Sequence, residues 1–197
     1  MSKIYKTAPL PFQGQKRRFV NEFTLAIKEL MEKQEIKIVV DLFGGSGLLS
    51  HTVKCLYPDC RVIYNDYDNY SFRLRNIGAT NRLLSDIRVL LADCPREKKL
   101  TDSHKNSIVS LIEKENDKGY VDYITLSSSL LFSSQYRTDL NELRKEPFYN
   151  RVKASGYDFD ADEYLRGLEI VCVDYQLLYK QYKDVPGVLF LVDLAVS

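Results

Sequence analysis

Asp41-Leu42-Phe43-Gly44-Gly45-Ser46-Gly47 is a glycine-rich turn that follows the apolar run 36–40. Small residues in such a turn let the backbone approach a ligand and expose the amide groups that begin the next helix. Ser50 stands where the dinucleotide fingerprint has its last glycine, and the Gly-Lys-Ser/Thr of a phosphate-binding loop is absent. The turn therefore predicts either a nucleotide-type site or an ordinary strand-to-helix connection.

Strands are indicated by four short apolar runs rich in β-branched residues, at 36–40, 62–64, 170–173 and 188–192. Their nearly continuous hydrophobicity is typical of a parallel sheet covered on both faces. Each run is followed by polar residues, which are Asp41, Asn65-Asp66, Asp174 and Asp193. Because open α/β sheets bind ligands at the carboxyl ends of their strands, we expect a site at that edge.

Helices are predicted over 17–33, 48–56, 70–91, 103–118, 121–132 and 160–166. The segment between the second and third strands is far longer than one crossover helix needs. We therefore expect an α/β core with a mostly parallel sheet, made of residues 1–69 and 168–197. Residues 70–167 are expected to form a helical insertion.

The composition excludes several classes of protein. With 45% hydrophobic and 12% aromatic residues, the 197-residue chain can bury the core of one domain. It has no apolar run long enough for a membrane span and no apolar leader, which predicts a cytoplasmic protein. The four cysteines form no Cys-x-x-Cys pair and there are only two histidines, which argues against a metal site and for free thiols.

An acid and a basic segment strengthen the nucleotide interpretation. Asp66 ends the second predicted strand, where a carboxylate can accept both ribose hydroxyls. Residues 65–69 are also typical of a turn, so a solvated turn acid is the alternative. The first twenty residues contain five cations and no acid, which suits either an anionic ligand group or a solvated helix start. The net charge of +1 does not by itself suggest a polyanionic partner.

Four segments carry a resemblance to a known family, and they are Leu10-Pro11-Phe12-Gln13-Gly14-Gln15-Lys16, the glycine-rich turn, Tyr64-Asn65-Asp66-Tyr67-Asp68 and Cys172-Val173-Asp174-Tyr175. They resemble motifs of the D12 class of adenine-specific DNA methyltransferases, which includes Dam-like, phage-borne and restriction-modification members. The turn is similar to the family's Asp/Glu-Pro-Phe-x-Gly-x-Gly motif, with Leu42 in place of proline. The resemblance implies a Rossmann-like methyltransferase core, with DNA recognition in the insertion.

The resemblance also implies S-adenosylmethionine as cofactor and double-stranded DNA as partner. By this resemblance Lys16 would hold the cofactor's carboxylate, Asp66 its ribose and Asp174 its adenine. The full set of expected cofactor-binding residues is Phe12, Lys16, Asp41, Phe43, Gly44, Gly45, Ser46, Gly47, Asp66, Asp174 and Tyr175. Carboxylates such as Asp41 and Asp66 suit a sulfonium better than a pyrophosphate, which favours this cofactor over NAD.

The sequence departs from the family at the catalytic motif. That motif is Asp-Pro-Pro-Tyr, whereas here Asp193, the expected catalytic residue, is followed by Leu194-Ala195-Val196. We therefore expect a truncated methyltransferase that lacks its C-terminal strands, binds cofactor weakly and is weakly active or inactive. A homodimer or a complementing C-terminal fragment would supply the missing strands. The alternatives are a non-catalytic DNA-binding remnant and an NAD-dependent oxidoreductase.

Tyrosines and cations alternate in the second half of the predicted insertion. The tyrosines are Tyr123, Tyr136, Tyr149 and Tyr157, and the cations are Arg137, Arg144, Lys145, Arg151 and Lys153. Such residues can face DNA phosphates and bases. Because Asp139, Glu142 and Glu146 lie among them, the favoured interpretation is an ordinary charged helix surface.

Overall fold

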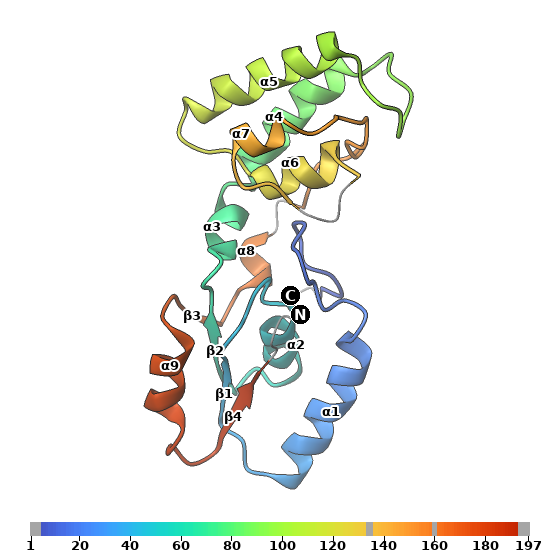
Figure 1. Ribbon diagram of the computed structural model, residues 1–197. Helices are drawn as coiled ribbons and strands as arrows, with labels where there is room; N and C mark the ends of the chain where they lie inside the picture. The colour runs from blue at the N-terminus through green and yellow to red at the C-terminus, as the bar shows by residue number, and fades with distance from the viewer. Residues whose placement is uncertain (1–4, 133–135, 159–160, 193–197) are drawn as a thin grey trace. The chain divides into compact units, whose positions relative to one another are not determined.

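The computed structural model describes residues 5–132, 136–158 and 161–192 of the chain. These residues divide into two compact units, which Figure 1 shows. The first unit contains Met1–Leu74 and Asp160–Ser197, and the second contains Arg75–Phe159. The first unit holds the sheet, and the second is helical. The mixed α/β class predicted from the sequence is confirmed.

An all-parallel sheet forms the centre of the first unit, in the order β3-β2-β1-β4. Its strands are β1 (Ile38–Asp41), β2 (Arg61–Asn65), β3 (Glu169–Val171) and β4 (Val188–Leu191). In the register of this sheet, Asp41 lies between Tyr64 and Leu191, and Asn65 lies opposite Val171. Parallel pairing therefore brings the carboxyl ends of all four strands to one edge, as the sequence predicted.

Helices cover both faces of this sheet (Figure 1). On one face, α1 (Val20–Lys33) and α2 (Leu48–Leu56) contribute Ile27 and Val53 to a core with Val39. On the other face, α9 (Tyr175–Tyr182) packs Leu178 and Tyr182 against β1 and β2. Burying an aliphatic side chain of this size contributes about 1.5–3 kcal/mol, so these contacts hold the helices on the sheet.

The expected helix over 70–91 is instead two helices, α3 (Tyr70–Arg75) and α4 (Ile77–Leu90). Asn76 separates them with φ −99° and ψ 13°, outside helical geometry. Asparagine is a weak helix former because its side chain competes for backbone hydrogen bonds. The break lies next to the boundary between the two units.

Two helices were not predicted, α9 and α7 (Leu140–Leu143). Both are too short to show a clear helical period of apolar residues. The sequence feature that could have predicted them is the acid at the N-cap. Asp174 accepts a hydrogen bond from the backbone N–H of Gln176, and Asp139 accepts one from that of Glu142. The predicted helix over 160–166 is α8 (Ala161–Tyr164), while its proposed cap, Asp160, lies outside the described residues.

The second unit packs α4 against α5 (Asp102–Asn116), together with α6 (Tyr123–Leu130) and α7. Its buried apolar side chains include Leu83, Leu84, Ile87, Ile108, Ile112, Leu126, Leu130 and Phe148. The side chains of Thr101 and Asp122 cap α5 and α6, which satisfies amide groups at the start of each helix. The unit therefore has a hydrophobic core of its own.

Three predictions from the composition concern the thiols, a metal site and a membrane span. Cys55, Cys60, Cys94 and Cys172 are all free thiols. Within residues 5–132, 136–158 and 161–192, no group of three or more potential ligands is placed to hold a metal ion. No helix in the same ranges has the length and hydropathy needed to cross a bilayer.

The side chain of Asn65 links the carboxyl ends of three strands. Its Nδ2 donates to the carbonyls of Leu42, at 3.0 Å, and Val173, at 2.9 Å. Its Oδ1 accepts from the backbone N–H of Val173 at 3.1 Å. Asn65 is buried, so losing these bonds would leave backbone groups without partners inside the protein.

We predict that Asn65→Ala lowers the free energy of unfolding by about 2–3 kcal/mol, because each of these bonds contributes about 0.5–1.5 kcal/mol. Urea unfolding followed by circular dichroism measures the change. Gln181→Ala, at an exposed position of α9, is the control and should stay within about 0.5 kcal/mol of the parent. Equal stabilities for the two variants would contradict the prediction.

Candidate functional site

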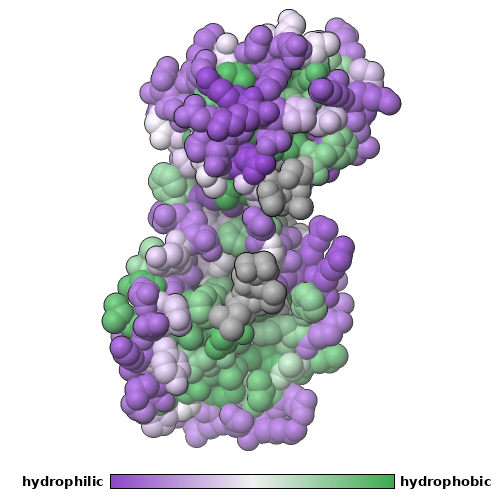
Figure 2. All heavy atoms as spheres, viewed as in Figure 1, coloured by the Kyte–Doolittle hydropathy of each residue, from purple (hydrophilic) through white to green (hydrophobic). Residues whose placement is uncertain are grey.

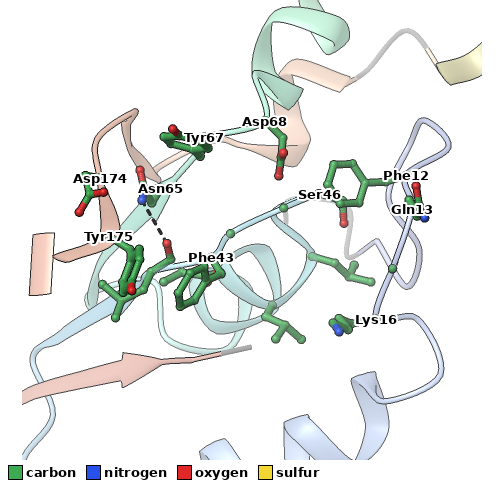
Figure 3. Close-up of a pocket in the computed structure, with 17 residues that line it drawn as sticks. Phe12, Gln13, Lys16, Phe43, Ser46, Asn65, Tyr67, Asp68, Asp174 and Tyr175 are labelled. Carbon is green, nitrogen blue, oxygen red and sulfur yellow. Dashed lines mark hydrogen bonds between the residues drawn. The ribbon is translucent and has the colours of Figure 1, made fainter. Parts of the chain in front are cut away.

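A cavity of about 510 Å³ opens at the carboxyl edge of the sheet in the first unit. Its size falls in the range of small-molecule sites. Figure 3 shows that its walls come from the amino-terminal segment, the β1–α2 turn, the end of β2 and the start of α9. It is lined by Phe12, Gln13, Gly14, Lys16, Asp41, Leu42, Phe43, Gly44, Gly45, Ser46, Leu48, Leu49, Asn65, Tyr67, Asp68, Asp174 and Tyr175.

Most of the residues expected to hold a cofactor are brought together here. Those that line the cavity are Phe12, Lys16, Asp41, Phe43, Gly44, Gly45, Ser46, Asp174 and Tyr175. Gly47 and Asp66 do not line it. The expected catalytic residue, Asp193, lies outside the described residues.

Two tyrosine hydroxyls form hydrogen bonds with the backbone of the glycine-rich turn. Tyr64 donates from its hydroxyl to the carbonyl of Gly45 at 2.7 Å, and Tyr164 donates to that of Ser46 at 2.9 Å. A Cβ on Gly44 would lie 2.3 Å from two ring carbons of Tyr64, so no side chain fits there. Gly47 has φ +71°, which favours glycine. The turn therefore needs glycine for close packing and for its backbone conformation.

Asp66 was expected to bind the ribose of a cofactor, but it does not line the cavity. Its carboxylate accepts hydrogen bonds from the backbone N–H groups of Tyr70, at 2.6 Å, and Ser71, at 2.9 Å. The Tyr64 hydroxyl lies 3.0 Å from the same carboxylate and shares its single proton between this carboxylate and the carbonyl of Gly45. The physical reason is that the first amide groups of α3 have no partner within the helix, and this buried acid supplies one.

Asp68, two residues further on, faces the cavity instead (Figure 3). Both acids lie in a turn, in which the N–H of Asn69 donates to the carbonyl of Asp66 at 3.2 Å and Asn69 adopts φ +54°. Desolvation and the neighbouring Asp66 carboxylate raise the pKa of Asp68, while Arg73 opposes them. Sequence reasoning missed Asp68 because two acids of one turn look equivalent until the start of α3 engages the first.

The amino-terminal segment is fixed to α3 by two side chains. Tyr70 accepts at its hydroxyl from the N–H of Leu10, at 2.9 Å, and donates to the carbonyl of the same residue at 3.1 Å. Arg73 donates to the carbonyl of Pro11 at 2.8 Å. The ring of Phe12 then meets that of Tyr70 edge-on, with centroids 5.7 Å apart. These contacts place Phe12 and Lys16 on one wall of the cavity.

Asp174 and Tyr175 form the opposite wall, where α9 begins. The ring of Tyr175 packs against that of Phe43, with centroids 4.8 Å apart and planes tilted by 38°. Both rings line the cavity beside the Asp174 carboxylate. This wall therefore offers an apolar surface next to a hydrogen-bond acceptor, which suits a planar heteroaromatic group with an amino substituent.

Asp41 is buried at the end of β1, and its environment favours the protonated form. Burial raises its pKa to about 6, although hydrogen bonds from Ser50 and the backbone of Phe43 lower it in part. The Ser50 hydroxyl donates to Asp41 at 2.6 Å. A cation bound in the cavity would favour the ionised form of this carboxyl group.

The lining residues give the cavity a negative character. It contains the carboxyl groups of Asp41, Asp68 and Asp174 and one ammonium group, that of Lys16. A pyrophosphate would meet repulsion from these acids, whereas a ligand with an additional positive charge would be attracted by them. The lining thus suits a positively charged ligand that also carries an amino-substituted planar ring.

We predict that the stabilities of the parent and Asp41→Asn respond differently to pH. The folded-state pKa of Asp41 is raised above its unfolded value, so the folded state binds the extra proton between about pH 4 and 6. This contribution to stability is present below pH 4 and is lost as pH rises through 6. The stability of Asp41→Asn relative to the parent should therefore rise by about 1–3 kcal/mol between pH 4 and 7.

Urea unfolding at several pH values measures this difference. Asp59→Asn, at an exposed turn position, is the control and should give a difference that changes little with pH. A flat difference for Asp41→Asn as well would contradict the prediction.

Comparison with known proteins identifies the family of this chain. A family described as D12 class N6 adenine-specific DNA methyltransferase matches residues 12–184. A Haemophilus influenzae protein named "Putative methyltransferase" is 39% identical, over 97% of this chain and 64% of its own length. The chain thus spans a little under two thirds of that relative. Since the family match covers most of the chain, the protein belongs to the D12 class N6 adenine-specific DNA methyltransferase family.

Proposed function

We propose that this chain binds S-adenosylmethionine in the cavity beside the Gly44–Gly47 turn, for methyl transfer to N6 of adenine in double-stranded DNA. The observation that carries the proposal is the set of groups around one glycine turn. It combines an ammonium on one wall, an acceptor and two rings on the other, and carboxylates between them. The family match supports the reaction class.

Each wall of the cavity has a proposed task. Lys16 pairs with the carboxylate of the cofactor, and Asp174 accepts a hydrogen bond from its adenine amino group. Phe43 and Tyr175 provide the apolar surface for the adenine ring. The bound cofactor supplies a methyl group activated by a positively charged sulfur.

We propose different roles for the two acids near the expected ribose position. Asp66 holds the turn against α3 through its bonds to Tyr70 and Ser71. Asp68, which faces the cavity, accepts hydrogen bonds from the ribose hydroxyls. Asp66 is therefore a positioning residue in this proposal, and replacing it would act through the turn.

On the DNA side, we propose that Asp193 accepts a hydrogen bond from the amino group of the target adenine. The residues that follow are Leu194, Ala195 and Val196, which provide no ring to stack on an extruded base. Base stacking contributes about 1–3 kcal/mol in nucleic-acid sites. We therefore propose slow methyl transfer by this chain alone, with a non-catalytic DNA-binding protein as the second candidate. Either would act on DNA in the cytoplasm.

We further propose that β4 receives another strand. In the described part of the sheet, β4 pairs with β1 on one side and with no strand on the other. The carbonyls of Gly187 and Leu191 point to β1, so alternation directs the backbone groups of Val188 and Phe190 to the open edge.

Apolar side chains also gather around this edge. Hydrophobic residues cover the region of β4 in Figure 2, and Val192 is 59% exposed. Tyr179 on α9 is 46% exposed, and the centroid of its ring lies 5.1 Å from that of Phe190 on β4. Parallel sheets are normally buried on both faces, so such exposure suits a docking surface. We propose as occupant a polypeptide equivalent to the part of the Haemophilus influenzae relative that this chain does not span.

The cofactor proposal is tested by isothermal titration with S-adenosylmethionine. We predict that Lys16→Ala and Asp174→Ala each raise Kd by about 10- to 100-fold, because each removes a polar contact worth about 1.4–3 kcal/mol. Lys6→Ala, an exposed cation outside the cavity, should leave Kd unchanged. Preference for NAD, or equal affinities for all variants, would refute the proposal.

The strand-docking proposal is tested by light scattering coupled to gel filtration. The part of the relative without a counterpart here is expressed separately and mixed with this chain. We predict a one-to-one complex, weakened about tenfold or more by Val188→Pro, which removes an N–H from the open edge. Val188→Ala is the control for loss of the side chain. A homodimer, or no complex, would exclude this occupant.

A further inference from the structure

Two kinds of partner hold five arginines of the second unit. Arg137 forms an ion pair with Glu146, and Arg144 forms one with Glu113 at 2.7 Å. These two cations are therefore neutralised within the unit. For them, the interpretation as an ordinary charged surface fits the structure.

Three other arginines donate to backbone carbonyls instead. Arg88 donates to the carbonyls of Lys153, at 3.1 Å, and Ala154, at 3.3 Å. Arg96 donates to the carbonyl of Val152, and Arg151 to that of Leu131. A carbonyl carries no net charge, so these bonds orient the guanidinium groups without neutralising them.

These charges collect around one short stretch of chain, residues 151–154. Lys153 adds a fourth cation, which is exposed and lies 4.5 Å from the centroid of the Tyr157 ring. In the described ranges, no carboxylate lies within 4.0 Å of the charged groups of these four side chains. The 151–154 segment therefore has four cations beside it that form no ion pair within the described residues.

The backbone around this segment is fixed. Asn150 donates from its N–H to the carbonyl of Lys98 at 3.0 Å, and Glu97 donates to the carbonyl of Asn150 at 2.7 Å. Arg151 donates from its N–H to the carbonyl of Ser129 at 3.2 Å. The cations are thus held in place before any partner binds, which reduces the ordering cost of binding.

An exposed aromatic ring accompanies the cations. Phe132 is 52% exposed, although phenylalanine is normally buried. The Arg151 guanidinium lies 4.7 Å from the centroid of its ring, and the Tyr149 ring meets it edge-on at 4.6 Å. A ring held between a cation and a second ring, with about half its surface free, can stack on an unpaired base.

We infer that Arg88, Arg96, Arg151 and Lys153 form a phosphate-binding surface on the second unit, and that Phe132 stacks on a base displaced from the duplex. The inference rests on the proposed DNA substrate and adds the residues that contact it. Phosphates supply the negative charge that the 151–154 segment lacks, and the adjacent ring favours a nucleic acid over an acidic protein. It selects the DNA-facing interpretation for Arg151 and Lys153 and the surface interpretation for Arg137 and Arg144.

The test uses the full chain, a fluorescent 20-base-pair duplex and Kd values over a series of salt concentrations. Lys153→Ala and Arg96→Gln should each weaken binding and reduce the slope of log K against log salt by about one. The control is Arg144→Gln, which changes the net charge by the same amount but removes a cation already paired with Glu113. Its slope should equal that of the parent.

Stacking is tested on the same duplex with one mismatched pair, where a base leaves the helix more easily. Phe132→Leu should weaken binding to the mismatched duplex by about 5- to 100-fold and affect the matched duplex less. Val89→Ala, another exposed apolar side chain of this unit, is the control. Circular dichroism and thermal unfolding check that each variant keeps the parent fold.

These measurements need no cofactor, so they separate the inference from the proposed function. Smaller salt slopes for the two surface variants than for Arg144→Gln support the inference, whether or not S-adenosylmethionine binds. Equal slopes for all variants, or a parent that binds no duplex, would overturn it. Cofactor binding by the parent in that case would leave the proposed function in place.

Discussion

The contact between the Tyr64 ring and the glycine-rich turn is the constraint on which the site depends. The ring occupies the space that a side chain on Gly44 would fill, and its hydroxyl holds the carbonyl of Gly45. The same hydroxyl lies 3.0 Å from the carboxylate of Asp66, the acid that caps α3, and shares its proton between the two acceptors. One buried side chain thus links the turn after β1 to the helix after β2, so the cavity floor and one wall are positioned together.

Competition for hydrogen-bond partners explains the electrostatic character of both units. In the first unit, Asp66 is engaged by amide groups of α3, which leaves Asp68 to face the cavity. In the second unit, Glu113 and Glu146 engage two arginines, while backbone carbonyls engage three others. In each case the group that faces solvent or a ligand is the one that neighbouring elements have not neutralised.

Much of the fold was predictable because its signals are local. The four apolar runs correspond to the four strands, and Asp41, Asn65 and Asp174, at or soon after the ends of β1, β2 and β3, line the cavity. The glycine-rich turn and the Phe12–Lys16 segment are read from adjacent residues, and both line the cavity. The break at Asn76 and the short helices α7 and α9 were not predicted, because each depends on one backbone angle or one capping bond. The motifs also carried the resemblance to a methyltransferase family, which the family match confirms.

Residue identity and spacing were thus enough for the parallel α/β class, the edge of the sheet that carries the cavity, and the family. Tertiary structure alone decided which of two acids in the 65–69 turn faces the cavity, and which cations of the second unit remain uncompensated. The physical reason is that both outcomes depend on partners from other elements. Asp66 is satisfied by a helix that begins after the turn, and Arg144 by Glu113 on α5. A local sequence pattern does not show which group from a distant element will pair with a given charged side chain.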